Sequence, residues 1–229
     1  MPDEHAGSAV GNNGGERGSR DGAGRVAYFL GGAYAKDRQR FMVDKTDFTR
    51  SPAMAEATAK AQDRAGVGLD DLECFDLYSC FPCAVSVARR ELGLAENDTR
   101  PLTTTGGLGF FGGPGSNYAL HGIATLSEKI AGGEHRRGMA TALGWFMHKY
   151  AAGVYSATPA TTDLATFDRE DEAHPSAGGR PIARVEQAEG RGTIETYTVM
   201  HDREGPTRAI VIAAVAVDAG TEFRLKVGV

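Results

Sequence analysis

Apolar runs and helical patterns alternate along the first two thirds of the chain. Residues 25–30 and 74–80 are short apolar runs typical of buried strands. A predicted helix follows each run, over residues 52–65 and 82–92. The first helix is clearly bounded, because Ser51 and Pro52 are typical of a helix start and Gly66 of a helix end. The order strand, helix, strand, helix predicts an α/β fold.

A third helix is predicted after a glycine-rich loop. Ser116 is its expected N-cap, and it extends to about Ile130. Its first half is apolar nearly all round, which is typical of a helix buried between two layers. The apolar runs at residues 139–146 and 151–156 are expected to form further strands.

The pattern divides the chain into four parts. Residues 1–24 contain seven glycines and little to bury, so they are expected to form a disordered tail. Residues 25–156 hold the α/β pattern, and the polar residues 157–180 indicate a linker. Residues 181–229 predict a small β module. Its expected strands are residues 182–187, 193–201, 208–217 and 222–227.

Charge and composition exclude several classes of protein. The net charge is -5 and no Lys/Arg block is present, so the chain lacks the basic footprint of a nucleic-acid binder. It has no apolar run of about 18 residues and no signal-peptide pattern, so no membrane insertion is expected. Its three cysteines do not make a disulfide framework. We therefore expect a soluble, cytoplasmic protein.

Two of the cysteines form a C-x-x-C pair at a strand-to-helix junction. A helix N-terminus beside Cys80 and Cys83 can lower a thiol pKa, as in disulfide oxidoreductases. Packing of small, apolar cysteines in a core is the alternative. No metal site is expected, because a second ligand pair is missing.

The glycine loop formally matches a dinucleotide fingerprint, Gly107-x-Gly109-x-x-Gly112. That fingerprint requires its third glycine inside the helix, and residues 113–115 intervene here, so NAD binding is disfavoured. Glycines also allow a backbone to approach a ligand closely and to aim N–H donors at a carbonyl oxygen. A purely structural turn is the alternative.

Two histidines and a tyrosine are further candidates. His121 lies in the apolar third helix, on the side opposite Ala119 and Ile123, and a buried imidazole there suits proton transfer. His148 follows the strand at 139–146, and Tyr78 lies in the second apolar run. Structural roles are the alternative for all three.

Three motifs together resemble the C-terminal half of thiolase-superfamily acetyl-CoA acetyltransferases, in the sterol-carrier-protein-type branch. They are Asp76-Leu-Tyr-Ser-Cys-Phe-Pro82, residues 105–121 with their glycine loop, and residues 144–156. Residues 195–206 are similar to an added, OB-like β module of that branch. The resemblance implies a layered α/β domain with a mixed sheet, followed by a small OB-like barrel. It also implies acyl transfer on a coenzyme A thioester, in lipid metabolism, with no tightly bound cofactor and no metal.

The residues expected at catalytic positions of such an enzyme are only partly present. Gly113 stands where the family has a histidine, and Ala142 stands where it has an acid/base cysteine. The half that bears the nucleophile is not in this chain. Cys80 and His121 are therefore the candidate catalytic residues. The candidate substrate-binding residues are Tyr78, Gly106, Gly107, Gly112, Gly113, Asn117 and His148.

Three functions follow from these observations. The first is a thiolase-type acyltransferase that works with a partner chain, and the second is a non-catalytic subunit that binds acyl-CoA or a partner. The third is a C-x-x-C redox protein. In the first two cases the helix after Ser116 would need a partner on its apolar face, so a homo-oligomer or a complex with an N-terminal-half protein is expected.

Overall fold

The computed structural model describes residues 9–10, 26–38, 41–45, 47–160, 183–184, 191–217 and 221–228. These residues fall into two compact units. The first lies within residues 1–37 and 49–176, and the second within residues 38–48 and 177–229. Most of the expected tail and linker lies outside the described residues, and the predicted domain boundaries stay a prediction.

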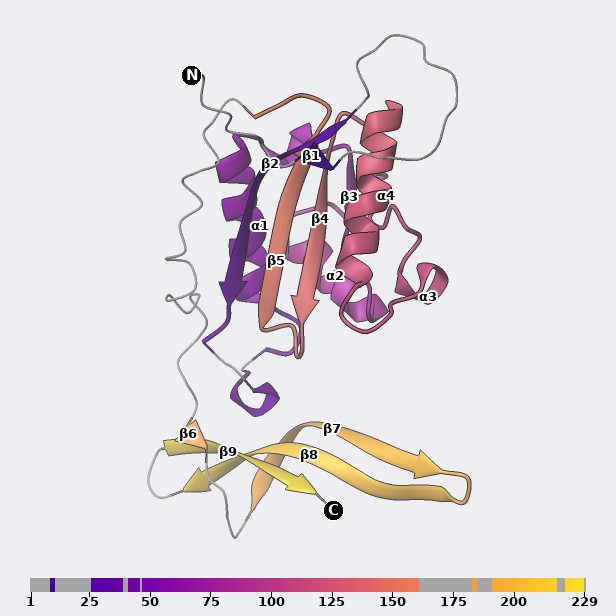
Figure 1. Ribbon diagram of the computed structural model, residues 1–229. Helices are drawn as coiled ribbons and strands as arrows, with labels where there is room; N and C mark the ends of the chain where they lie inside the picture. The colour runs from indigo at the N-terminus through magenta and orange to yellow at the C-terminus, as the bar shows by residue number, and fades with distance from the viewer. Residues whose placement is uncertain are drawn as a thin grey trace, which may run out of the picture. The chain divides into compact units, whose positions relative to one another are not determined.

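A five-stranded mixed sheet forms the centre of the first unit, in the order β1-β2-β5-β4-β3 (Figure 1). Strand β3 is parallel to β4, and the other neighbours are antiparallel. The strands are β1 (Ala9–Val10), β2 (Ala27–Lys36), β3 (Cys74–Asp76), β4 (Arg137–Gly144) and β5 (Lys149–Ser156).

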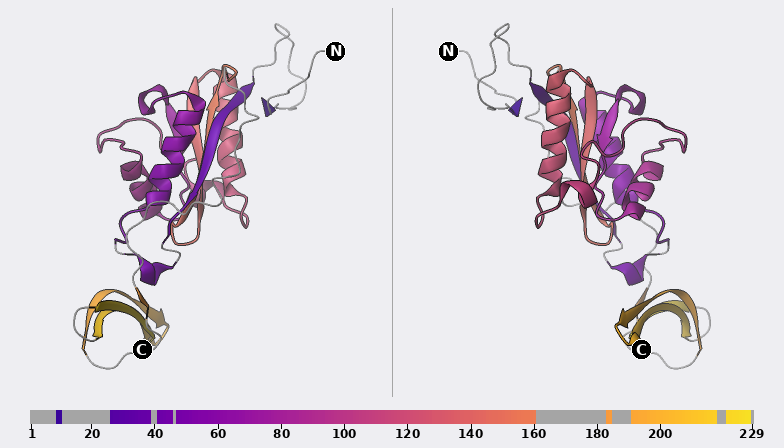
Figure 2. Two further views of the ribbon diagram at one scale, coloured as in Figure 1. Left: turned by 90° about the vertical axis from the view of Figure 1, so that its left-hand side faces the viewer. Right: turned by 90° about the vertical axis from the view of Figure 1, so that its right-hand side faces the viewer.

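Helices cover the two faces of this sheet unequally. Helices α1 (Pro52–Ala65) and α2 (Pro82–Glu91) pack on one face, and α4 (Tyr118–Gly132) packs on the other (Figure 2). A single turn, α3 (Leu108–Phe111), lies inside the glycine loop, and a short 3-10 helix, η2 (Leu69–Asp71), precedes β3. The larger core is on the α1 side, where Met54, Phe75 and Val154 are fully buried.

Helix α1 confirms the prediction made from its bounding residues. It begins at Pro52 and ends at Ala65, and Gly66 takes the left-handed conformation with φ 65°. Ser51 occupies the N-cap position, but its hydroxyl donates to the carbonyl oxygen of Met147 at 2.5 Å instead of capping the helix. This bond joins α1 to the β4–β5 hairpin.

Strand β2 continues to Lys36, whereas the sequence predicted a strand that ends before Gly31. Both Gly31 and Gly32 lie inside the strand. A Cβ atom on Gly31 would lie 2.8 Å from the backbone nitrogen of Ala65, so glycine lets the end of α1 approach the strand. A Cβ atom on Gly32 would meet the carbonyl oxygen of Ala152 at the same 2.8 Å. Here glycine serves close packing, whereas the sequence pattern suggested the end of a strand.

Two other element boundaries differ from the prediction. Strand β3 ends at Asp76, and on both sides of this end the backbone N–H groups of Phe75 and Leu77 donate to the carbonyl oxygens of Pro101 and Leu102. Helix α4 starts at Tyr118 with Asn117 as N-cap, so the expected cap at Ser116 is wrong. Only one side of α4 is buried, since Leu120 is 61% exposed and Ala124 is also exposed.

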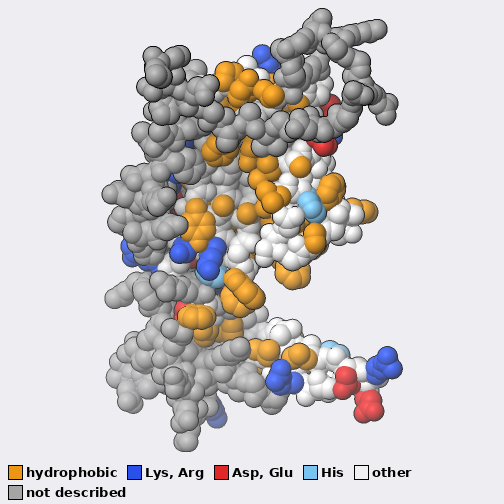
Figure 3. Space-filling view, in the orientation of Figure 1, with side chains coloured by type: hydrophobic (Ala, Val, Ile, Leu, Met, Phe, Trp, Pro, Cys, Tyr) orange, Lys and Arg blue, Asp and Glu red, His pale blue; other side chains and the backbone are white. Residues whose placement is uncertain are grey.

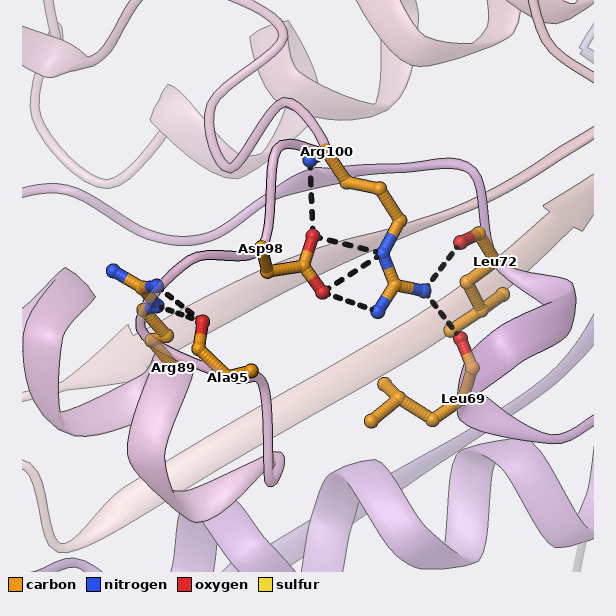
Figure 4. Close-up of polar contacts among 6 residues, drawn as sticks. All are labelled: Leu69, Leu72, Arg89, Ala95, Asp98 and Arg100. Atoms are coloured by element: carbon orange, nitrogen blue, oxygen red, sulfur yellow. Dashed lines mark hydrogen bonds and ion pairs between the residues drawn. The ribbon is translucent and has the colours of Figure 1, made fainter.

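The loop between α2 and α3 is held by one arginine (Figure 4). The Arg100 guanidinium donates to the carbonyl oxygens of Leu69 at 2.7 Å and Leu72 at 2.8 Å. It also forms an ion pair with Asp98 at 2.6 Å and lies over the Phe75 ring. Arg89, in the last turn of α2, donates to the carbonyl oxygen of Ala95 in the same loop.

The second unit contains a four-stranded sheet in the order β6-β9-β8-β7. Its strands are β6 (Ala183–Arg184), β7 (Gly192–Asp202), β8 (Gly205–Val217) and β9 (Thr221–Gly228), and a 3-10 helix, η1 (Met42–Asp44), belongs to the same unit. The β module is therefore present as predicted. The described strands form an open sheet with β6 and β7 at its edges, and they do not show closure into the expected OB-like barrel.

Among the described residues, no helix has both the length and the apolar character needed to cross a membrane.

Candidate functional site

The candidate residues gather at one end of the central sheet. Strands β3 and β4 are parallel, so both run toward the same edge, and β3 ends at Asp76, opposite Ala140 of β4. Tyr78 and Cys80 follow β3, and His148 lies in the turn after β4. Ligands in α/β folds commonly bind at this edge of the sheet.

A buried aspartate at the end of β3 organises the glycine loop. Asp76 is 1% exposed, and its Oδ2 atom accepts hydrogen bonds from the backbone N–H of Thr105 at 2.9 Å and from two hydroxyls. These belong to Thr104, at 3.1 Å, and Thr105, at 2.9 Å. The loop before the glycines is thus tied to the strand by a single carboxylate.

The Thr105 hydroxyl also begins a chain of hydrogen bonds toward α3. Its Oγ1 atom lies 2.7 Å from the Tyr118 hydroxyl oxygen. The Ser79 hydroxyl donates to the same Tyr118 oxygen at 3.1 Å, and the backbone N–H of Leu108 donates to Ser79 Oγ at 2.9 Å. These bonds connect the start of α4, the end of β3 and the glycine loop.

The proton of each hydroxyl in this chain has an assigned direction. Thr105 has one hydroxyl proton, which it donates to Asp76, so Tyr118 must be the donor in its bond to Thr105. Ser79 donates to Tyr118 and accepts from Leu108. All three hydroxyls therefore donate toward the Asp76 carboxylate, which fixes the position of the loop.

The glycines of the loop take conformations that other residues rarely adopt. Gly106, Gly107 and Gly112 have φ values of 83°, 98° and 84°. A Cβ atom on Gly113 would lie 2.8 Å from the Leu108 side chain. The backbone N–H groups of Gly113 and Gly115 have no hydrogen-bond partner within the described part of the chain. They are available as donors to a carbonyl oxygen.

His121 lies in the first turn of α4, beside the glycine loop. Its ring centroid is 5.1 Å from that of Phe111, and its Nδ1 atom is buried without a hydrogen-bond partner in the described residues. The structure shows no hydrogen bond between His121 and Cys80 among the described contacts. The two expected catalytic residues are therefore not paired in this chain.

Burial favours the protonated thiol in two of the cysteines, Cys74 and Cys80. Burial raises the pKa of Cys80, although backbone hydrogen bonds partly offset this effect. Burial also raises the pKa of Cys74, to about 12. Cys83 is exposed at the start of α2. The raised pKa of Cys80 argues against the low-pKa thiol that the redox function requires.

The turn between β4 and β5 carries His148 and an unusual backbone. Trp145 and Met147 have φ values of 46° and 58°, in a region that non-glycine residues rarely enter. Trp145 is 79% exposed, whereas His148 is buried with its ring stacked on Phe146. The carbonyl oxygen of His148 accepts a bond from the Asp37 N–H at 2.8 Å. His148 thus lies in a strained turn.

Two other predicted contact residues lie beside the loop. The Tyr78 ring packs edge-on against Tyr118, with centroids 5.3 Å apart, and its backbone N–H donates to Thr141 Oγ1 at 2.9 Å. Asn117 is exposed at the start of α4, and its side chain makes no capping bond. The Tyr78 ring therefore packs beside the hydrogen-bonded Tyr118, and Asn117 is the exposed residue directly before Tyr118.

The residues that hold the site together were not among those predicted from the sequence. Asp76, Ser79, Thr105 and Tyr118 form the hydrogen-bonded chain described above. A signal for them exists, because Asp76 ends an apolar run and Thr105 directly precedes the glycines. The contact between these segments, however, depends on the folded chain. No group of His, Cys, Asp and Glu side chains suited to a metal ion occurs in the residues that the structure describes.

Comparison with known proteins bears on the family of the chain. The model of the thiolase-like protein type 1 additional C-terminal domain matches residues 180–221. No curated protein matches the chain.

A solved structure covers most of the chain. The crystal structure of a monomeric SCP2-thiolase like protein type 1 from Mycobacterium smegmatis is 39% identical, with a TM-score of 0.70. The match covers 88% of this chain and 43% of that protein, so the chain spans less than half of the relative's length. The chain therefore belongs to the thiolase-like proteins of the SCP2 branch and carries their additional C-terminal domain.

Proposed function

We propose that the chain takes part in thiolase-type acyl transfer on a coenzyme A thioester. The observation that carries this proposal is the glycine loop at the carboxyl edge of the sheet, fixed by Asp76 and lying beside the unpaired Nδ1 atom of His121. The free N–H groups of Gly113 and Gly115 would stabilise negative charge on a thioester oxygen. His121 would accept or return a proton.

The nucleophile of the reaction would come from outside these 229 residues. Of the three cysteines, Cys74 is buried and Cys83 lies in α2, so Cys80 is the remaining candidate nucleophile. Its raised pKa leaves it protonated near neutral pH, and no base is hydrogen-bonded to it among the described residues. A partner chain or another part of a longer protein would therefore complete the site.

The raised pKa of Cys80 also favours a second, non-catalytic function. A site with backbone donors but without an activated nucleophile suits binding of acyl-CoA without turnover. In that case the chain would be a non-catalytic subunit that holds the thioester or recognises a partner protein.

The test is an acyl-CoA cleavage assay on the chain alone and after co-purification with the product of the neighbouring gene. We expect no turnover by the chain alone and turnover by the complex. His121→Ala should then lower kcat by about a hundredfold, in the range that general acid–base catalysis contributes. Cys83→Ser, which changes an exposed thiol, is the matched control and should leave the rate unchanged.

Other outcomes separate the alternatives. Binding of acyl-CoA with no turnover in any complex would support the non-catalytic subunit. An unchanged rate in His121→Ala would remove the assigned proton-transfer role. Insulin reduction by the chain would instead support the C-x-x-C redox function, against the raised pKa of Cys80.

A further inference from the structure

Thr141 lies near the carboxyl end of β4 and forms three hydrogen bonds through a buried hydroxyl. Its Oγ1 atom accepts a bond from the Tyr78 N–H at 2.9 Å and another from the Tyr150 hydroxyl at 2.8 Å. Its own proton goes to the carbonyl oxygen of Asp76 at 3.3 Å. A hydroxyl has one proton and two lone pairs, so the hydrogen-bonding capacity of Thr141 is fully used.

This hydroxyl bonds to the chain where the backbone pairing of β3 with β4 stops. The pairing ends at Asp76. Backbone N–H groups alternate in direction along a strand, and those of Phe75 and Leu77 donate to the segment on the other side of β3. The Tyr78 N–H therefore points toward β4, where the Thr141 side chain replaces a backbone carbonyl as its acceptor. A side chain thus fixes the backbone just beyond the strand.

The segment that carries Cys80 is held by a second contact as well. Ser79 Oγ donates to the Tyr118 hydroxyl, at the start of α4, over 3.1 Å. Cys80 follows directly, and α2 begins two residues later at Pro82. The backbone before Cys80 is therefore fixed by β4 through Tyr78 and by α4 through Ser79, so the position of the thiol depends on both bonds.

Among the described residues, one thiol and two phenols interact electrostatically with Cys80. Burial, and then the charge of Cys83, raise the pKa of Cys80. Burial and the charge of Cys80 raise the pKa values of Tyr78 and Tyr150. Among the described residues, Figure 3 shows no Lys, Arg, Asp or Glu side chain around the first half of α4 on the face in view. Hydrogen bonds, rather than ion pairs, therefore order this end of the sheet.

Tyr150 is close enough to Cys80 for the two groups to influence each other, yet its proton is bound elsewhere. The buried Tyr150 hydroxyl donates to Thr141. A phenol has one proton, so Tyr150 cannot donate to a Cys80 thiolate at the same time. Such a bond would favour the thiolate. Thr141 thus holds the backbone before Cys80 and also keeps a nearby donor away from the sulfur.

We propose that Thr141 is a positioning residue that sets the reactivity of the Cys80 thiol. It acts through Tyr78, whose backbone it holds, and through Tyr150, whose proton it accepts. The inference deepens the proposed function and rests on it for the role of Cys80 at the candidate site. Loss of the Thr141 hydroxyl would release the segment before Cys80 and free the Tyr150 proton, and both changes would make the thiol more reactive.

Thr141→Val tests the proposal, because valine is branched like threonine but lacks the hydroxyl. Alkylation of the full chain by iodoacetamide is followed at each cysteine by mass spectrometry over a range of pH. At neutral pH the variant should alkylate Cys80 about tenfold faster than wild type, which corresponds to a fall of about one unit in the apparent pKa of that reaction. The buried Cys74 and the exposed Cys83 should keep their wild-type rates.

Three further variants serve as controls. Thr141→Ser keeps the hydroxyl and should restore the wild-type rate, and Thr198→Val, at an exposed position of β7, is the matched control. Adding Tyr150→Phe to Thr141→Val should reverse the fall in the apparent pKa, because the freed donor is removed. Equal Cys80 rates in wild type and Thr141→Val overturn the proposal. Faster alkylation of all three cysteines also overturns it, because the whole fold has then loosened.

A measurement on the wild-type chain decides the matter if Thr141→Val does not fold. The Tyr78 amide proton should exchange with solvent at least about a hundredfold more slowly than in an unstructured chain, because Thr141 accepts it. Rapid exchange at Tyr78 overturns the proposal. These experiments use no acyl-CoA, so a chain that shows no acyl transfer in any complex would overturn the proposed function and leave the result for Thr141 unaffected.

Discussion

Asp76 joins three segments that are distant in the sequence. Its carboxylate accepts bonds from Thr104 and Thr105, and through Thr105 it orders the hydroxyls of Tyr118 and Ser79. The glycine loop can therefore hold its left-handed conformations at a fixed place beside α4. A site built from backbone N–H groups depends on such support, because the donors have no side chain of their own to anchor them.

Tyr118→Phe should show how much this support contributes. Removing the hydroxyl leaves Ser79 Oγ without its acceptor, and Thr105 Oγ1 keeps only the weaker of its two donors, the Gly107 N–H at 3.2 Å. The free energy of unfolding is expected to fall by about 1 to 3 kcal/mol, measured by urea denaturation. Tyr197→Phe removes an exposed hydroxyl and should cost almost nothing. Equal effects of the two changes would contradict a supporting role for the chain.

The sequence was informative about residue types and less so about their chemistry. The C-x-x-C spacing correctly marks a strand-to-helix junction, because that pattern is local. The pKa of Cys80 depends on how deeply the folded chain buries the thiol, and spacing contains no such information. The same holds for Tyr118, whose hydroxyl lies between two segments that meet only after folding.

At the scale of elements, α4 depends on a glycine to approach β3. A Cβ atom on Gly122 would lie 2.6 Å from Asp76 Oδ1, so any larger residue would push the helix away from the carboxylate. Gly132 lies in the same helix, but a Cβ atom there would meet nothing within 4 Å. Alanine at Gly122 therefore tests tight packing, whereas alanine at Gly132 tests helix propensity alone.

Gly122→Ala is expected to lower the free energy of unfolding by about 1 to 3 kcal/mol, the usual cost of overpacking. Gly132→Ala should instead raise it slightly, since alanine favours a helix by up to about 1 kcal/mol. Thermal and urea denaturation of both variants provide the measurement. Stabilisation by both would show that α4 has room to move.

The ion pair between Asp98 and Arg100 (Figure 4) makes a pH-dependent contribution to the free energy of unfolding. Hydrogen bonds from Arg100 lower the pKa of Asp98 to about 2, from about 4 in an unfolded chain. A lowered folded-state pKa stabilises the fold above pH 4, and this contribution is lost as the pH falls from about 4 to about 2.

Asp98→Asn should therefore reduce stability near neutral pH, and the difference from wild type should shrink as the pH approaches about 2. Urea midpoints at several pH values test this expectation. Glu96→Gln, an exposed change in the same loop, serves as the control. A difference that is constant with pH would mean that the carboxylate charge does not matter.

Element boundaries could be predicted where the signals are local. Helix α1 was placed correctly because Ser51, Pro52 and Gly66 bound it in the sequence itself. The extent of β2 could not be predicted, because Gly31 and Gly32 serve contacts with α1 and β5. The start of α4 was missed by one residue, since Asn117 closes a turn by donating its N–H to the carbonyl oxygen of Pro114.

At the scale of the whole molecule, one residue can report on the candidate site. Trp145 is the single tryptophan of the chain, and it is exposed at the edge of the sheet where the glycine loop lies. Acyl-CoA bound at that edge should shift or quench Trp145 fluorescence in a saturable way. A control titration with free acetate should have no effect. An unchanged emission with acyl-CoA would place binding elsewhere.

The sequence predicted the two units of the molecule better than the surface between this chain and any partner. The motifs identified the α/β domain and the β module, because both are built from segments present in this chain. The partner expected on α4 could not be identified from the sequence, because the face beside α4 is lined by residues of β2, β4 and β5, which meet only in the folded sheet.

The hairpin tip has a last consequence, which concerns protein engineering. Trp145 and Met147 each hold a backbone conformation that costs a non-glycine residue about 1 to 2 kcal/mol. Trp145→Gly should therefore raise the melting temperature, while removing the exposed indole from the rim of the site. If the indole contacts a ligand, this turn is where a gain in thermostability would be traded against affinity.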